Sequence, residues 1–170
     1  MIIPPTVFVG GPIQYAIHAK GFDPTLRTIV IQILDCFEGK GFQVLSAHRY
    51  ERFGEVDTSG MHLEVARRDY DWMAACDVFV AVLPDDADGR PMRTDGTCVE
   101  LGWASGMGRS IVVVRNLEQE HSHLVKGIGV VANCIELDIR SVVANPATVV
   151  EAASMLLHEV RHPSRVNAVE

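Results

Sequence analysis

The sequence predicts a doubly wound α/β fold of the flavodoxin or Rossmann-like kind, with helices on both faces of a five-stranded parallel sheet. Short apolar runs alternate along the chain with longer segments whose apolar residues repeat at helical spacing. The apolar runs are continuous, as expected for strands buried on both faces, whereas half-exposed strands alternate apolar and polar residues. Alternating strands and helices favour parallel strands joined by right-handed crossovers.

The first half of the chain supplies two strands and two helices. TVFVGG, residues 6–11, is β-branched and aromatic and stops at paired glycines, so we predict a buried strand that enters a tight loop. Residues 24–42 repeat apolar side chains at helical spacing and end near two glycines, which predicts a helix. FQVLSA follows as the second strand, and residues 59–76 place their apolar side chains near one helical stripe.

The second half of the chain continues the alternation. DVFVAVLP, residues 77–84, is the most strand-like run, and a long loop covers residues 85–96. TCVELGWASGMG predicts a helix, SIVVVRN and NCIELD predict the fourth and fifth strands, and residues 146–162 predict a closing helix with Pro146 in its first turn.

Length and charge limit the classes of protein that fit. A chain of 170 residues suits a single domain spanning residues 1–170. A formal net charge of -7 argues against a nucleic-acid partner, which requires a clustered basic surface. The N-terminus lacks a basic region followed by a long apolar stretch, and no later run is long enough to span a membrane. We therefore predict a cytoplasmic protein that binds no membrane.

Loops at the carboxyl ends of the strands are the expected ligand site, because parallel sheets of this kind bind ligands there. This rule brings together residues 10–14, 46–52, 84–96 and the turn after Arg115. Gly10 and Gly11 would let a ligand approach backbone amides, and His48 and Arg49 lie just past the second strand as candidate base or phosphate contacts. FVGGP matches neither dinucleotide nor phosphate-loop patterns, which argues against a dehydrogenase or an NTPase.

Two acidic residues are candidates for catalysis. Thr97 to Glu100 reads T-x-x-E, which by itself fits a capping box, but Glu100 also follows the longest loop of the expected ligand site. Asp69 lies one helix upstream, where the alternative is a solvated position beside Arg67 and Arg68. Two acids in one crevice would allow one to attack an anomeric carbon while the other assists the leaving group, as in retaining glycosidases.

A metalloprotease pattern occurs near the C-terminus. HEVRH, residues 158–162, is a literal H-E-x-x-H, in which the two histidines bind zinc and the glutamate acts as a base. It falls at the very end of the last predicted helix, and only a short tail follows to supply a third ligand. His121 and His123 would have to complete such a site, but a polar loop is the simpler interpretation. We interpret the match as a coincidence and predict no metal.

Four segments together resemble the nucleoside 2-deoxyribosyltransferase family: FVGGP, LSAHR, RRDYDWMAACDVFVAVLP and DGTCVELGWASGMG. They are most similar to its nucleotide-cleaving branch, the cytidylate N-glycosidases, and the likeness covers roughly Thr6 to Arg115. The resemblance implies that Glu100 is the nucleophile and that Asp69 lies near the leaving base. It also implies attack on C1′ and a glycosyl-enzyme ester, which water or a second base resolves without a cofactor.

The loop before Glu100 bears on the substrate. The resemblance implies that an aspartate six residues before the nucleophile binds the 5′-hydroxyl in transferases, whereas phosphate-binding hydrolases have a serine there. Thr94 occupies this position, followed by Asp95 and Gly96. A neutral hydroxyl beside Arg93 tolerates a phosphate better than a carboxylate does. We therefore favour a nucleoside 5′-monophosphate, which hydrolysis would convert to free base and ribose 5-phosphate, and Asp95 keeps transfer between free nucleosides open.

The resemblance has further implications for substrate contacts and assembly. Ser122 resembles a serine that family hydrolases lend to a neighbouring subunit's phosphate site, which implies a homodimer with a shared active site; the alternative is an ordinary loop serine. Phe8 and Tyr70 are candidates for stacking on the base, although Phe8 also suits a strand core. The resemblance places Gln14 where the cytidylate branch has a basic residue that helps to recognise the substrate, so the identity of the cleaved base stays open. A binding module without turnover is the third alternative.

Overall fold

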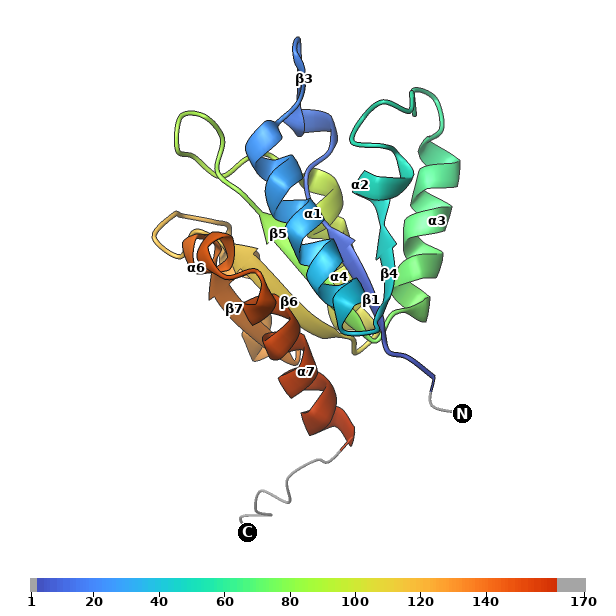
Figure 1. The fold of residues 1–170 in the computed structure, drawn as a ribbon, viewed down its shortest axis with the longest axis vertical. Helices are drawn as coiled ribbons and strands as arrows, with labels where there is room; N and C mark the ends of the chain where they lie inside the picture. The colour runs from blue at the N-terminus through green and yellow to red at the C-terminus, as the bar shows by residue number, and fades with distance from the viewer. Residues whose placement is uncertain (1–2, 162–170) are drawn as a thin grey trace.

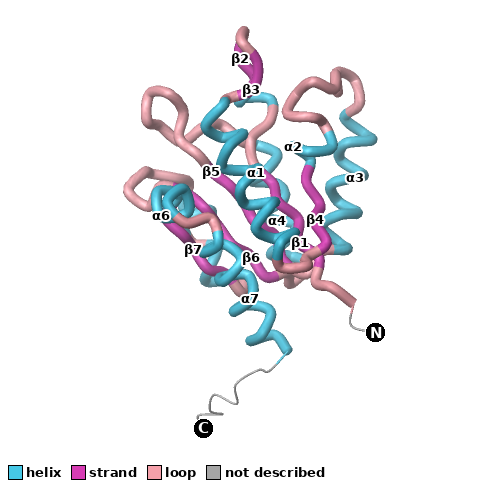
Figure 2. The backbone as a smooth tube through the Cα atoms, viewed as in Figure 1, coloured by secondary structure: helices cyan, strands magenta, loops and turns pink. Residues whose placement is uncertain are grey.

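The computed structural model describes residues 3–161 and contains a five-stranded sheet in the order β4-β1-β5-β6-β7. All four pairings are parallel, which confirms the predicted fold class (Figures 1 and 2). The strands are β1 (Thr6–Gly10), β4 (Gln43–Ser46), β5 (Val78–Leu83), β6 (Ser110–Arg115) and β7 (Cys134–Asp138). The chain steps from β1 to β4 on one side and then returns to β5 on the other, so the switch point lies between β1 and β5.

Helices cover both faces of the sheet. One face is covered by α1 (Pro24–Gly39) and α7 (Ala147–Arg161), which lie in front of the sheet in Figure 1. The opposite face is covered by α3 (His62–Ala75) and α4 (Asp95–Gly106), which pack against each other. Shorter helical segments complete the fold: η1 (Gln14–Ala16), α2 (Ala47–Tyr50), α5 (His123–Lys126), η2 (Ile128–Val130) and α6 (Ile139–Ala144).

The core is divided by the sheet into two apolar layers. In β5, Val78, Val80 and Val82 join the layer under α1 and α7. Phe79, Ala81 and Leu83 alternate with them and join the layer under α3 and α4. Because both faces of β5 are covered, every residue in it is buried and apolar, which explains the continuous apolar runs in the sequence.

The start of α4 differs from the prediction. The helix begins at Asp95, two residues before the predicted start, with Thr94 as its N-cap residue. Thr97 therefore lies inside the first turn, where its hydroxyl oxygen accepts a hydrogen bond from the Thr94 hydroxyl at an Oγ1–Oγ1 distance of 2.6 Å. The alternative of a capping box between Thr97 and Glu100 does not fit the structure, because Thr94 is the N-cap residue and Glu100 is already in the second turn of the helix. The burial of Glu100 needs another explanation.

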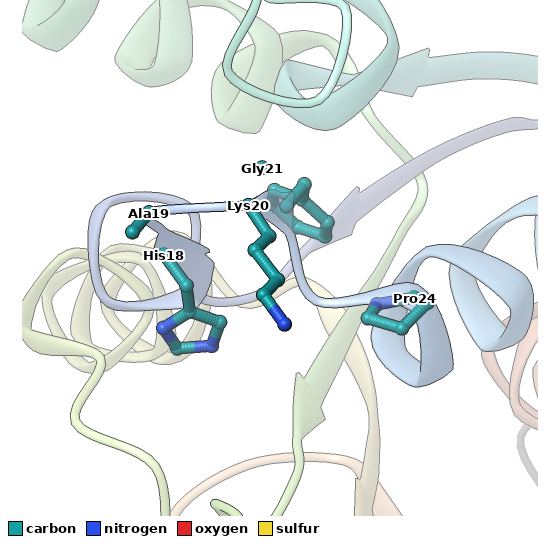
Figure 3. A pocket seen from close by; sticks show the side chains of 6 residues that line it. His18, Ala19, Lys20, Gly21 and Pro24 are labelled. Atoms are coloured by element: carbon teal, nitrogen blue, oxygen red, sulfur yellow. The ribbon is translucent and has the colours of Figure 1, made fainter.

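A small hairpin, which the sequence does not predict, projects beyond the sheet. It consists of β2 (Ile17–His18) and β3 (Gly21–Phe22), paired antiparallel. A hollow of about 550 Å³ lies beside it, lined by residues that include His18, Lys20 and Pro24 (Figure 3). Within residues 3–161, no helix has the length and apolar content that a membrane crossing requires.

Candidate active site

A cavity of about 980 Å³ opens where β1 ends, between the segments that lead into α3 and α4. Several residues that the sequence singled out line it together: Gly10, Gly11, Asp69, Thr94, Asp95, Gly96 and Glu100. Of the four predicted loops, residues 46–52 and 84–96 contribute only in part and the turn after Arg115 not at all. Neither Asp85 to Arg93 nor the turn after Arg115 lines the cavity. Those two segments bond to each other instead, through a hydrogen bond of 2.7 Å from Asn116 Nδ2 to Asp85 Oδ2.

Glu100 reaches the cavity from the second turn of α4 and is only 8% exposed. The structure gives its carboxylate no hydrogen bond to any residue between 3 and 161. The carboxylate lies against the end of β1, where a Cβ added to Gly10 would stand 2.6 Å from Glu100 Oε2. Gly10 is therefore required because any side chain there would occupy the space of the carboxylate.

Gly11 is required for a different reason. A Cβ at this position would stand 2.9 Å from the backbone oxygen of Val82 and 3.2 Å from Cε1 of His48. A backbone oxygen in a central strand has no room to move, so the glycine allows the loop after β1 to pack closely on β5.

Asp69 lies on α3 and is held by its neighbour Arg68. Arg68 Nε donates a hydrogen bond to Asp69 Oδ1 at 2.8 Å, and Arg68 Nη2 donates to Glu51 Oε1 at 2.7 Å. The guanidinium also lies 4.9 Å from the ring centres of both Tyr50 and Trp72. Sequence reasoning missed Glu51 and assigned Arg68 no role, because their pairing depends on how α2 packs beside α3.

The electrostatics of the site favour a proton among its carboxylates. Burial, with the nearby charge of Asp69, raises the pKa of Glu100 well above its ordinary value, and Arg68 opposes this shift. Burial also raises the pKa of Asp69, again opposed by Arg68. Asp69 and Glu100 both lie near the single cation of Arg68, so simultaneous ionisation of these two acids is disfavoured.

The rim of the cavity at the start of α4 carries an exposed ion pair. Arg93 Nε donates to Asp95 Oδ1 at 3.1 Å and to Asp95 Oδ2 at 3.0 Å, and Arg93 Nη2 donates to Oδ2 at 2.7 Å. These contacts lower the pKa of Asp95 below its ordinary value. The Arg93 guanidinium also lies 4.6 Å from the ring centre of Tyr15.

The loop of residues 54–60 forms one wall of the cavity, although the sequence did not indicate it. It follows two non-glycine residues in left-handed backbone conformation, Arg52 and Phe53, with φ values of 50° and 54°. Gly54 and Gly60, at the two ends of the loop, have φ values of 81° and 79°. Left-handed conformations cost non-glycine residues about 1–2 kcal/mol each, so the turn after Glu51 is held by the buried side chain of Phe53.

Phe8 and His48 lie beneath the cavity and do not line it. Phe8 is fully buried and packs against Trp72 and Phe79, with ring centres 5.7 Å and 5.3 Å away. This location agrees with the strand-core alternative and leaves no face for a base. His48 is also fully buried; its Nε2 lies 3.1 Å from the Pro12 oxygen, and burial lowers its pKa to about 4. It supports the loop after β1 from below.

Three other sequence candidates lie outside the cavity lining. Arg49 is exposed and forms an ion pair with Glu38 of α1. Tyr70 is exposed on α3, edge-on to Trp103 with ring centres 5.3 Å apart. Ser122 is exposed and caps α5, where its Oγ accepts a hydrogen bond from Val125 N at 3.3 Å.

No group of three or more His, Cys, Asp or Glu side chains within residues 3–161 is arranged to hold a metal ion. His158 lies on α7, and His162 of the HEVRH run is outside the described residues.

Comparisons with known proteins bear on the family and the fold. A sequence model described as nucleoside 2-deoxyribosyltransferase matches residues 17–154. The solution structure of BlsM is 25% identical, covers 96% of this chain and 98% of that chain, and has a TM-score of 0.75. No curated protein matches the chain.

Two further structures share the fold. The CMP N-glycosidase BcmB from Clostridium botulinum is 21% identical, with 78% of this chain and 88% of that chain covered and a TM-score of 0.51. A 2-deoxyribosyltransferase from Bacillus psychrosaccharolyticus is 18% identical, with 82% and 90% covered and a TM-score of 0.57.

Proposed function

The chain belongs to the nucleoside 2-deoxyribosyltransferase family, whose members act on nucleosides or nucleotides, and we propose that it hydrolyses the N-glycosidic bond of a nucleoside 5′-monophosphate. The products are the free base and ribose 5-phosphate. Glu100 is the nucleophile and Asp69 the acid that assists departure of the base.

One observation carries this proposal. Glu100 presents its carboxylate to an open cavity, at a position that Gly10 keeps free of side chains, and this carboxylate has no hydrogen bond to any residue that the structure describes. A structural carboxylate that is 8% exposed would be expected to have hydrogen-bond partners, because desolvation of an unpaired charge is costly. An unpaired carboxylate in a cavity is instead suited to bond formation with a ligand.

The reaction follows from the two carboxyl groups. The ionised Glu100 oxygen attacks C1′, the bond from C1′ to the base nitrogen breaks, and its electron pair leaves with the base. Glu100 and Asp69 share one proton, and the reaction proceeds from the state in which that proton lies on Asp69, which supplies it to the departing base. Water then attacks C1′ of the glycosyl ester, gives its proton back to Asp69, and releases Glu100 as a carboxylate. The only cosubstrate in this sequence is water.

The rim at the start of α4 supports a monophosphate. Thr94 provides a neutral hydroxyl, and the first backbone amides of α4 point their positive end toward the cavity rim. The nearby carboxylate of Asp95 is already matched by Arg93, which reduces its repulsion of a phosphate.

The acidity of the cavity favours a second candidate function, transfer of 2-deoxyribose between free nucleosides. No Lys or Arg within residues 3–161 lines the cavity, whereas six acids do: Glu51, Glu55, Asp57, Asp69, Asp95 and Glu100. A substrate without a phosphate enters such a cavity at less electrostatic cost. In this alternative, Asp95 binds the 5′-hydroxyl of the sugar.

We also propose that the protein acts as a homodimer in which Ser122 completes a phosphate site in the partner. Ser122 is exposed and lies outside the cavity of its own chain. The adjoining segment includes Leu124 and Val130, whose exposed fractions of 85% and 89% favour burial by another surface. Light scattering and the effect of Ser122→Ala on the KM for a monophosphate test this assembly.

The decisive experiment is chromatographic detection of free base from a panel of nucleosides and 5′-monophosphates, with wild type and Glu100→Ala in parallel. Base released from monophosphates by wild type alone supports the hydrolase. Release from free nucleosides only, with exchange when a second base is added, supports the transferase. Binding measured by calorimetry without release from any substrate would contradict both enzymatic proposals.

A further inference from the structure

We propose that Glu51 and Arg68 are positioning residues of this active site: Arg68 fixes the carboxyl group of Asp69 beside Glu100, and Glu51 fixes Arg68. The inference rests on the proposed function, because it assigns both residues to the reaction that Glu100 performs. It also predicts a property of the free enzyme, so it is testable without turnover.

Arg68 is constrained by two carboxylates and two aromatic rings. Its guanidinium donates to Asp69 Oδ1 and Glu51 Oε1, at 2.8 Å and 2.7 Å. It also lies against the rings of Tyr50 and Trp72, whose centres are each 4.9 Å away and which contact each other edge to face. The side chains of Glu51, Arg68 and Asp69 are only 7%, 13% and 11% exposed. A planar group held at two donors and packed against two rings is restricted in orientation, so the carboxylate bonded to it is oriented as well.

The bond between Arg68 and Asp69 is unusual for its place in the sequence. Consecutive residues of an α-helix point about 100° apart around its axis, so neighbouring side chains do not normally face each other. The hydrogen bond from Arg68 Nε therefore restricts the side-chain rotamer of Asp69. Glu51 anchors the other end of the guanidinium from a different element, 17 positions earlier in the chain.

Charge gives the two residues opposite influences on Glu100. The charge of Arg68 lowers the pKa of Glu100, whereas the charge of Glu51 raises it. The remaining charged group on α3 that acts on Glu100 is Asp69, which raises it. Gly10 of β1 and Phe79 of β5, which contact this region from below, carry no charge. Other ionisable residues that line the cavity are Glu55, Asp57, His62 and Asp95.

The test compares Glu51→Gln, Arg68→Lys and Arg68→Met in two measurements. The first is kcat and kcat/KM against pH with the best substrate. The second is a titration of the Glu100 carboxyl carbon by ¹³C NMR in the free protein. Glu118→Gln and Arg140→Met are matched controls, because Arg140 also bridges two acids, Glu118 and Asp138, but is exposed and far along the chain.

The three variants have distinct expected results. Glu51→Gln keeps a hydrogen-bond acceptor and removes a negative charge, so the Glu100 midpoint and the acid limb of kcat/KM move down by about one pH unit. Arg68→Met removes the cation, so the titration midpoint of Glu100 and the acid limb of kcat/KM both move to higher pH. In this variant kcat also falls by about 100-fold, because Asp69 loses its orientation. Arg68→Lys keeps the positive charge but lacks the planar set of donors of a guanidinium. The titration midpoint of Glu100 therefore stays near that of wild type, while kcat falls by roughly 10-fold or more.

Shifts in the same direction for Glu51→Gln and Arg68→Met, or shifts no larger than those of the controls, would overturn the proposal. So would wild-type kcat in both Arg68 variants. If Arg68→Met does not fold, the contrast between Glu51→Gln and Arg68→Lys still decides the outcome. A wild type that releases no base refutes the proposed function, whereas the NMR titration decides the role of Glu51 and Arg68 independently.

Discussion

Gly10→Ala is expected to impair catalysis by displacing Glu100, the proposed nucleophile, while the fold is retained. The added Cβ would stand 2.6 Å from Glu100 Oε2, whereas ordinary contacts begin at 3.4 Å. The carboxylate must therefore move by 3.4 − 2.6 = 0.8 Å. A misplacement of about 1 Å can cost on the order of 100-fold in rate, so we expect kcat to fall by roughly 10- to 100-fold.

The stability of this variant is expected to change much less than its activity. The carboxylate is the end of a flexible side chain and gives way easily. Phe79 ring atoms at 3.0 Å and 3.1 Å add a packing cost of about 1–3 kcal/mol, and the less flexible unfolded chain offsets about 0.4–1 kcal/mol of it.

The assay is kcat for base release together with the free energy of unfolding from urea titration. Gly102→Ala is the matched control on the nucleophile's own helix. No atom lies within 4 Å of the added Cβ, so this variant should keep its kcat and gain about 1 kcal/mol of stability. Gly11→Ala should instead lose stability, because its Cβ meets the Val82 backbone oxygen at 2.9 Å. Wild-type kcat in Gly10→Ala would refute the assignment of Glu100 Oε2 to the reacting position.

Three further predictions concern single residues. Glu100→Gln should lower kcat by roughly 1000-fold or more. Because the pKa of Glu100 is raised in the folded protein, wild type loses stability as pH rises from about 4.5 through that pKa, so the variant's advantage in urea titrations should grow over this range. Phe8→Leu should lower the free energy of unfolding by about 1 kcal/mol and leave KM unchanged, and a raised KM would place Phe8 in contact with substrate. Asp95→Asn should lower the KM for monophosphates by up to about fivefold, because it frees Arg93; a lower KM for free nucleosides alone would contradict this reasoning.

The sheet could be predicted because its strands are buried on both faces. In β5 each residue belongs to one of two apolar layers, so every position of the run is apolar and the strand can be recognised from the sequence. The β2–β3 hairpin could not be predicted in the same way, since strands of two residues have no period. The start of α4 was misplaced because its first turn, Asp95 and Gly96 followed by Thr97, contains no apolar residue to mark helical periodicity.

The site was predictable where it depends on strand ends and less so where it depends on helix packing. The carboxyl-end rule led to Gly10 and Glu100, and the structure places both on one cavity. Glu51, which directly follows α2, pairs with Arg68 because α2 and α3 lie side by side. The spacing of the two residues in the sequence does not predict that contact. Phe8 shows the converse, since its residue type suits both a stacking platform and a core, and only its full burial decides between them.

The loop of residues 54–60 has a practical consequence for redesign. Glu100 and Asp69 are carried by helices, whereas this loop forms a separate wall of the same cavity between two glycines in left-handed conformation. Surface loops tolerate substitution far better than packed helices do. A library confined to residues 55–59 would therefore vary the shape of this wall while leaving the two proposed catalytic carboxyl groups in place, so substrate preference could be changed separately from the proposed chemistry.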